Sequence, residues 1–372
     1  NAPFSAAGST ATTQWERLIE KYNSPTSGDT WASFRAYLNT ISEGKHDVYS
    51  TFPQTRADGG VDYITLSGAA SDYVNNDHRL LSEIATQFAE RYPNYDASNA
   101  SLIRKDYLDN LVIIPQVSEA TFTAHKADGS SYNLSFGGKY VGSYNIVDTA
   151  RMNSGSEADP ASVAAHEYLH SYGAPDLYRT SGAGEPVGVW DIMAKGASRS
   201  WPLAQTRADI GWTSIEEISG AGTYTLGTVG SDYNQAVMVK SPRNDSEYFV
   251  IEYRKKSEGY SDPDRFIGGS GLIVYRVNPL RKEMGNTGDD GFLQDYIYVF
   301  RPGETGLTDA AGNTYYAYLS NAATRPVGVA SSVGSTDLSA TITDGALVYS
   351  DGTNSGIKVE VVGEGSASST FR

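Results

Sequence analysis

The sequence predicts an α+β fold in two parts, and three observations predict it. Apolar residues recur at spacings of three and four in several stretches of the first 100 residues, as in helices that bury one face. A later segment, HEYLH, places two histidines four residues apart, as on one face of a helix. From about Ile218 onward, β-branched and aromatic runs separated by Gly, Asn and Asp are typical of an all-β domain. We therefore expect a twisted sheet with helices over 1–215 and a β-sandwich-like domain over 216–372.

Local patterns predict the individual elements. In the first part, helices are expected at 13–22, 30–41, 77–92 and 203–212, and extended segments at 46–54, 60–66, 111–115 and 138–150. In the second part, the expected strands are AVMVKS, EYFVIEYR, GLIVYRV, YIYVF and GIKVEVV. The last extended segment of the first part leads into the helix that carries the histidines.

The composition excludes several classes of function. The chain has 372 residues and a formal net charge of −15, and its basic runs are as short as Arg254-Lys255-Lys256, so we expect no nucleic-acid partner. No apolar run approaches the roughly 20 residues that span a bilayer, so we expect no membrane span. Cysteine is absent, which leaves His, Asp and Glu as protein ligands for a zinc ion.

The histidine helix has clear start and stop signals. Asp159 followed by Pro160 is a good helix start, with Asp at the N-cap and Pro at the first helical position. Gly173 is a good stop, because glycine tolerates the left-handed conformation that ends many helices. The helix is therefore expected at about 160–172.

The two histidines and the glutamate between them form a zinc-binding motif. His166 and His170 lie one turn apart on one face, as zinc ligands do, and Glu167 lies about 100° around the helix, within reach of a zinc-bound water. The alternative is a helix that carries two histidines by chance, which is rare in a chain with five histidines. We expect a zinc site with Glu167 as the general base.

A catalytic zinc usually takes three protein ligands and a water, so a third ligand is required. Asp176 is the first candidate, because His-Glu-x-x-His-x-x-Gly-x-x-Asp resembles the metzincin signature with Asp in place of the last His. Metzincins also have a methionine turn under the zinc, which Met193 in VWDIMAKG supplies. Glu185 is the alternative third ligand. A gluzincin-type peptidase would instead use a distant glutamate, and Glu216 and Glu217 lie in a weakly helical segment.

Four segments resemble one protein family in order and spacing. They are HEYLHSYGAPDLY, GEPVGVWDIMAKG, EYFVIEYR and GLIVYRVN, and they resemble the immune inhibitor A family of secreted bacterial metallopeptidases. The resemblance implies a metzincin-like zinc peptidase domain with zinc at His166 and His170, Glu167 as the base and Asp176 as the third ligand. It also implies secretion, with which the small polar start NAPFSAAGSTATT agrees.

The resemblance implies calcium binding as well. Asp106, Asp109 and Asn110 form the best oxygen cluster for this ion. A phenol near the zinc would help to stabilise the oxyanion of the transition state, and Tyr178 and Tyr172 are the candidates.

We expect a monomeric zinc endopeptidase that acts on proteins or peptides. The alternative from another class is a cell-surface binding module, catalytically weak or inactive, in which the metal only stabilises the fold. Structural zinc sites are normally closed by four protein ligands, and the sequence offers three obvious ones. The open fourth position favours the enzyme.

Overall fold

The computed structural model describes residues 14–29, 31–53, 62–117, 121–149, 161–180, 185–288, 295–301, 332–334 and 346–372. The chain forms two compact units. The first comprises Asn1–Asn39 with His46–Tyr172, and the second comprises Thr40–Lys45 with Gly173–Arg372. In the described part of the chain, no helix is long and apolar enough to cross a membrane.

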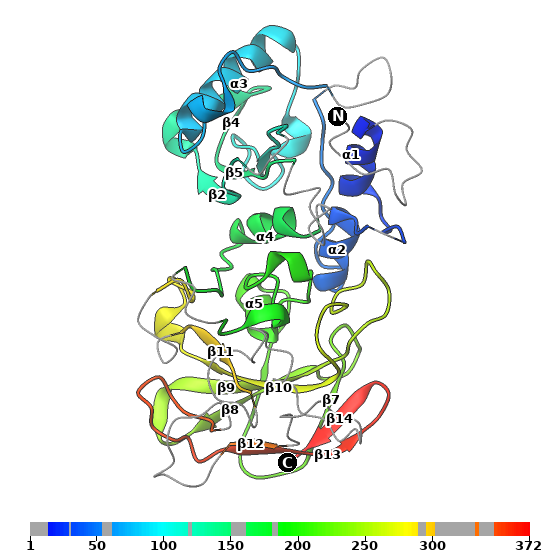
Figure 1. Ribbon diagram of the computed structural model, residues 1–372, viewed down its shortest axis with the longest axis vertical. Helices are drawn as coiled ribbons and strands as arrows, with labels where there is room; N and C mark the ends of the chain where they lie inside the picture. The colour runs from blue at the N-terminus through cyan, green and yellow to red at the C-terminus, as the bar shows by residue number, and fades with distance from the viewer. Residues whose placement is uncertain are drawn as a thin grey trace. The chain divides into compact units, whose positions relative to one another are not determined.

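The first unit combines helices with two small sheets (Figure 1). Its α-helices are α1 (Gln14–Asn23), α2 (Phe34–Ile41), α3 (Asp77–Arg91) and α4 (Val163–His170), and short 3-10 helices lie at Ala70–Asp72, Ser98–Ala100 and Ser130–Tyr132. In the larger sheet, β5 (Ser143–Ile146) lies between a parallel β1 (Leu111–Ile113) and an antiparallel β2 (His125–Asp128). The smaller sheet pairs β3 (Ser135–Phe136) with β4 (Lys139–Tyr140).

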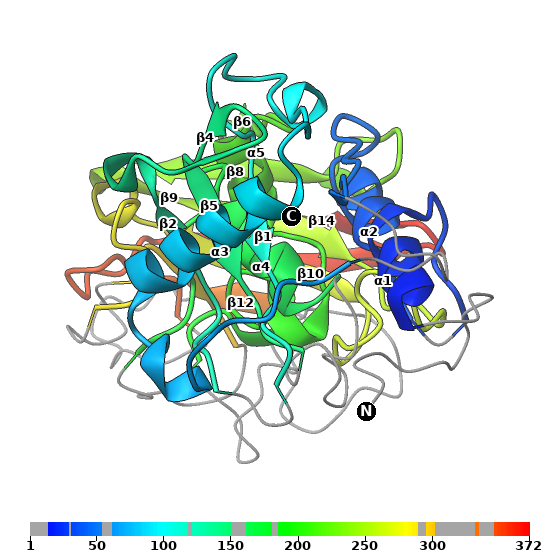
Figure 2. The same ribbon diagram turned by 90° about the horizontal axis from the view of Figure 1, so that it is seen from above.

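Helix α3 covers one face of the larger sheet (Figure 1, Figure 2). Asn76 caps the start of the helix, because its side chain accepts a hydrogen bond from the Arg79 amide. The apolar residues of α3 recur at helical spacing, so one side of the helix is buried. That side shares a core cluster with β5, and its members include Leu80, Leu81, Ala85, Phe88, Tyr144 and Ile146.

The opposite face of the sheet packs against α4. Side chains alternate along a strand, so Ser143 and Asn145 point away from the face that carries Tyr144 and Ile146. Ser143 Oγ lies 2.8 Å from Ser171 Oγ, just after the end of α4. Helix α4 also contacts β2. The sheet therefore lies between α3 and α4.

The predicted helices of the first unit are confirmed, with ends that differ by a few residues. The described residues of the segments expected to be extended at 46–54 and 60–66 belong to no strand. Strand β2 was not predicted, because its sequence HKAD lacks apolar alternation. It lies at the edge of the sheet with half-exposed side chains, so burial imposes little pattern on it.

The second unit contains two β-sheets and a short α-helix, α5 (Ala204–Ile210). One sheet has the order β11 (Ile297–Val299), β10 (Gly271–Val277), β9 (Asn244–Arg254), β8 (Ala236–Ser241) and β6 (Glu216–Ile218). The other has the order β12 (Ser332–Gly334), β13 (Lys358–Glu364), β14 (Ser368–Phe371) and β7 (Tyr224–Gly227). Short 3-10 helices lie at Gly188–Trp190, Gly196–Ser198 and Pro279–Arg281.

The two sheets of the second unit share one hydrophobic core, as in a β-sandwich (Figure 1). Strand β10, with the sequence GLIVYRV, is buried along its whole length between β9 and β11. The core draws on both sheets, with members such as Val237, Phe249, Val274, Val359 and Phe371. All five predicted strands of this region are present. The segment with Glu216 and Glu217 is strand β6, which corrects the expectation of a weak helix there.

Residues 173–215 belong to the second unit, whereas the sequence predicts that the first domain ends at 215. The reason is a set of buried polar contacts. Arg254 of β9 donates to the carbonyls of Trp190 at 2.8 Å and Trp201 at 3.0 Å, and Glu252 accepts from the Ala204 amide at 2.6 Å. These contacts attach the segment to the β-sheet. The division into a catalytic domain and a β-domain at 215/216 stays a prediction about function.

Candidate metal centre

Helix α4 presents the predicted zinc motif. It covers Val163–His170 and begins after Ser162, while the expected start at Asp159 and Pro160 lies outside the described residues. Gly173 follows the helix with φ +83°, as predicted from its position.

His166, Glu167 and His170 come together as a group. One ligand atom from each lies within 4.8 Å of those of the other two, and in the described part of the chain no other three His, Asp or Glu residues form such a group. The two imidazole rings are nearly perpendicular, with an interplanar angle of 89°. His166 and Glu167 are 6% and 5% exposed. Two imidazole nitrogens and a nearby carboxylate fit a zinc ion with a general base beside it.

Tyr168 of α4 and Tyr172, which follows the helix, lie beside His46. Tyr168 Oη is 3.0 Å from His46 Nε2 and 3.0 Å from Tyr172 Oη. Burial raises the pKa of both phenols and lowers the pKa of His46. Because Tyr168 is offset by two residues from each histidine, it points away from them. The hydrogen bond between Tyr168 and His46 was not predicted from the sequence, and Tyr172 as the oxyanion helper stays a prediction.

The backbone that carries Asp176 is fixed within the second unit. Its carbonyl accepts a hydrogen bond from the Asn286 amide at 2.8 Å, and the Leu177 amide donates to the Met193 carbonyl at 3.0 Å. Asn286 Nδ2 also donates to the Leu177 carbonyl at 3.1 Å. The segment of the predicted third ligand is therefore hydrogen-bonded to the predicted methionine turn.

Asp191 holds this turn from inside the protein. Its carboxylate accepts from the amides of Met193 and Leu203 and from the Thr206 hydroxyl, each at 2.7 Å. Met193 itself is fully buried. Burial raises the pKa of Asp191 to about 6, against the hydrogen bonds, which lower it. This role could not be predicted from the sequence, because Leu203 and Thr206 lie more than ten residues away along the chain.

Glu185 and Tyr178 lie at more open positions. A carboxylate oxygen of Glu185 is 3.7 Å from Lys195 Nζ, and the side chain is 37% exposed. Its Oε2 atom is buried and has no hydrogen-bond partner. Tyr178 is 38% exposed.

The oxygen cluster predicted for calcium has other contacts. The two carboxylate oxygens of Asp109 accept from the amides of Leu102 and Ile103, both at 2.8 Å, so Asp109 fastens a loop. The Asn110 amide is buried without a partner. The Asp106 carbonyl accepts from the Tyr140 amide at 2.9 Å. A calcium ion at Asp106, Asp109 and Asn110 stays a prediction.

The glutamates considered for a gluzincin-type site are engaged on the surface. Glu217 pairs with Lys240 at 2.6 Å, with both side chains about half exposed. Glu216 accepts from Asn234 Nδ2 at 3.0 Å. Both glutamates are exposed, whereas His166 and Glu167 of α4 are buried.

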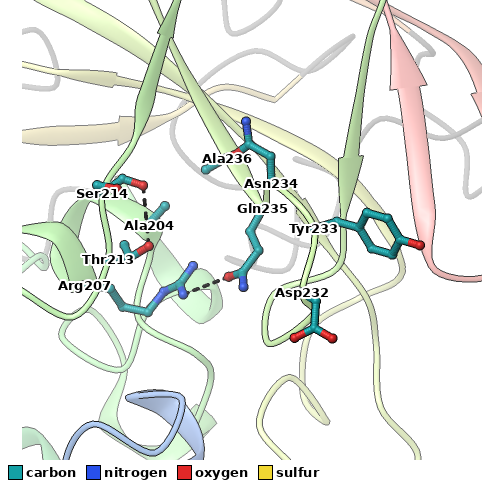
Figure 3. Close-up of a pocket in the computed structure, with 9 residues that line it drawn as sticks. All are labelled: Ala204, Arg207, Thr213, Ser214, Asp232, Tyr233, Asn234, Gln235 and Ala236. Carbon is teal, nitrogen blue, oxygen red and sulfur yellow. Dashed lines mark hydrogen bonds between the residues drawn. The ribbon is translucent and has the colours of Figure 1, made fainter.

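A polar hollow occurs among residues of the second unit (Figure 3). Arg207 is its main charged group, and its Nη1 donates to Gln235 at 3.0 Å and to Glu43 at 2.8 Å. The guanidinium is thus already paired with a carboxylate, and we assign the hollow no ligand. Its lining residues are Ala204, Arg207, Thr213, Ser214, Asp232, Tyr233, Asn234, Gln235 and Ala236.

The described features place two histidines and a glutamate that could hold a metal ion on a helix next to a mixed sheet. Residues 116–216 match the family model of the immune inhibitor A peptidase M6, catalytic domain. This match confirms the family resemblance that the motifs predicted, and it includes β2, β5, α4 and α5.

Two curated proteins are similar to part of this chain. Both are described as Pre-pro-metalloprotease PrtV, from two strains of Vibrio cholerae serotype O1, and each is 32% identical to this chain over 111 residues. The match covers 26% of this chain and 12% of each relative, so the chain spans only a small part of these relatives.

Proposed function

We propose that the chain is a secreted zinc-dependent endopeptidase with a metzincin-like catalytic domain. The observation that carries the proposal is the group of His166, Glu167 and His170, whose ligand atoms lie within 4.8 Å of one another on one helix. The match of residues 116–216 to a metallopeptidase catalytic domain supports the same reading.

In this proposal His166 and His170 hold the metal, and Asp176 is the third ligand. Bound zinc supplies Lewis acidity to a water molecule and to the substrate carbonyl. Glu167 accepts a proton from the attacking water and delivers it to the leaving amine. Because Glu167 is only 5% exposed, little bulk water competes with this proton transfer.

The rest of the proposal concerns the protein as a whole. We propose proteins or peptides as substrates, because the related catalytic domain is that of a peptidase. Secretion, a monomeric state, the calcium site and Tyr178 or Tyr172 as the oxyanion helper belong to the proposal in the same way.

The rival proposal is a metal-stabilised binding module. Chelation separates the two. If the chain is a peptidase, the purified protein cleaves casein, loses this activity with a zinc chelator and regains it when zinc is restored. If the zinc-loaded protein leaves casein and a library of unstructured peptides intact, and chelation only lowers its thermal unfolding midpoint, the binding module is the better account.

A further inference from the structure

Asn145 is a buried amide without a partner. It lies in β5 and is 2% exposed, and neither Oδ1 nor Nδ2 has a hydrogen-bond partner. Unpaired polar atoms in a protein interior cost free energy, so most buried side-chain amides bond to protein or to ordered water. An apolar residue would fill the same place without this cost. The amide therefore requires an explanation other than packing.

The face of the sheet that Asn145 occupies is known from its neighbours. Tyr144 Oη donates to Asp77 of α3 at 2.6 Å, so Tyr144 points toward α3. Asn145 follows Tyr144 and must point to the other face, toward α4. Ser143, two residues earlier on β5, shares that face, and its Oγ lies 2.8 Å from Ser171 Oγ.

Glu167 lies on the side of α4 that faces Asn145. It precedes Ser171 by four residues, or about one turn, so both occupy the same side of the helix. Two strand residues span about 7 Å and one helical turn spans about 5.4 Å. These two lengths are similar. The contact between Ser143 and Ser171 therefore places Glu167 about level with a residue two positions from Ser143, which is either Val141 or Asn145.

The charge environment of His125 shows which of the two residues lies level with Glu167. Burial lowers the pKa of His125, whereas Asp77, Thr123 and the Glu167 carboxylate raise it, and the net shift is upward. His125 pairs with Ile146, the residue after Asn145. Glu167 is therefore near the Asn145 end of β5.

We propose that Asn145 is a positioning residue for Glu167. Through one ordered water, its Nδ2 group donates toward the Glu167 carboxylate and holds it in the orientation that accepts a proton. The site suits a bridging water, because the amide provides a donor and an acceptor and the carboxylate provides further acceptors. This inference rests on the proposed role of Glu167 as the general base.

The direct test is Asn145→Leu, which keeps the volume and removes both polar atoms. We expect kcat for a peptide substrate to fall roughly 10- to 100-fold, as for other groups that orient a catalytic residue. KM and zinc content should remain near wild type. Asn145→Asp keeps the size but replaces the donor with a like charge, and it should lower kcat at least as far.

Ser369→Ala is the control. Ser369 is also fully buried with a side-chain polar atom that has no partner, but it lies on β14 in the second unit. Its kcat should stay within about 2-fold of wild type. Equal loss in both variants would show a general effect of buried polar groups on the fold and would overturn the inference.

A double-mutant cycle on thermal unfolding keeps this inference separate from the proposed function. If Asn145 acts on Glu167, the midpoint shifts of Asn145→Leu and Glu167→Gln are non-additive, whether or not the chain cleaves peptides. Non-additive shifts in a wild-type chain that cleaves nothing would overturn only the proposed function. Additive shifts, together with wild-type kcat in Asn145→Leu, would overturn the role of Asn145.

Discussion

Glu167 is buried and has two imidazoles beside it, so a change in this one side chain tests its proposed role as the general base. Glu167→Gln should keep its zinc, because the amide has nearly the same shape and the histidines remain. It should lower peptidase activity by several orders of magnitude through loss of the base. Activity on casein and zinc by atomic absorption are the measurements. Glu217→Gln, at an exposed glutamate on β6, is the control. If Glu167→Gln loses zinc in the same proportion as it loses activity, Glu167 is a metal ligand instead.

The third ligand is a second residue-scale question. Asp176→Ala should weaken zinc affinity strongly and lower activity, because it removes a bond between the metal and an oxygen. Glu185→Ala should keep zinc near the wild-type level, since a carboxylate oxygen of Glu185 already lies 3.7 Å from Lys195 Nζ and the side chain is 37% exposed. Zinc content after dialysis decides between them. The reverse pattern would assign the site to Glu185.

Residues could be predicted from the sequence where their neighbours are local. His166, Glu167 and His170 belong to one helix, so the spacing of the motif sets their geometry. Asn145 and Asp191 could not be predicted, because their surroundings come from the packing of segments that are distant in sequence. A single Asn or Asp letter does not show whether its side chain is buried.

At the scale of elements, the turn that contains Met193 depends on one buried carboxylate. The pKa of Asp191 is raised from 3.8 to about 6, so the folded state binds its proton more tightly than the unfolded state. The stabilising contribution of this proton is complete below pH 3.8 and is lost as the pH rises to about 6. The free energy of unfolding of wild type should therefore fall relative to Asp191→Asn over this range, by on the order of 3 kcal/mol. Urea unfolding of both proteins from pH 4 to 7 tests this, and parallel curves would contradict it.

The segment of Asp176 is also positioned by a close backbone contact. Gly285 has φ +58°, and a Cβ atom there would lie 2.1 Å from the Asp176 carbonyl oxygen. Gly285→Ala must therefore displace this backbone, and we expect lower stability and weaker zinc binding although no ligand is changed. Gly220→Ala is the control, because Gly220 has φ +82° but no atom within 4 Å of the added Cβ. It should cost only about 1 kcal/mol of backbone strain and leave zinc affinity unchanged.

Elements with strong local patterns were predictable, and edge elements were not. Helix α3 and strand β10 have long apolar patterns because each is buried against a core. The edge strands β2 and β6 carry polar residues, HKAD and EEI, since little of their surface is buried. Their strand state depends on pairing with a neighbour, which no local pattern encodes.

For the molecule as a whole, the division into units follows from where buried charges are satisfied. Arg254 is fully buried on β9, and its guanidinium bonds to Glu252 at 3.0 Å and to both oxygens of Asp264. It also bonds to the carbonyls of Trp190 and Trp201, which lie ahead of the β-domain that the sequence predicted. Burial lowers the pKa of Arg254, but the two carboxylates outweigh this effect and raise it. This network joins residues 190–201 to the sheet.

Arg254→Met tests how far the second unit depends on this network. Methionine fills much of the space, but it leaves the carboxylates of Glu252 and Asp264 buried without their cation. Breaking a buried pair on one side costs about 3–5 kcal/mol. The cost should appear as a lower urea midpoint, while the slope of the unfolding free energy against urea concentration stays unchanged. Lys240→Met removes the cation of an exposed pair, with side chains 48% and 50% exposed, and should cost less than about 1 kcal/mol. Equal costs for the two variants would mean that the buried network contributes no more than a surface ion pair. The attachment of residues 190–201 to the sheet would then depend on apolar packing.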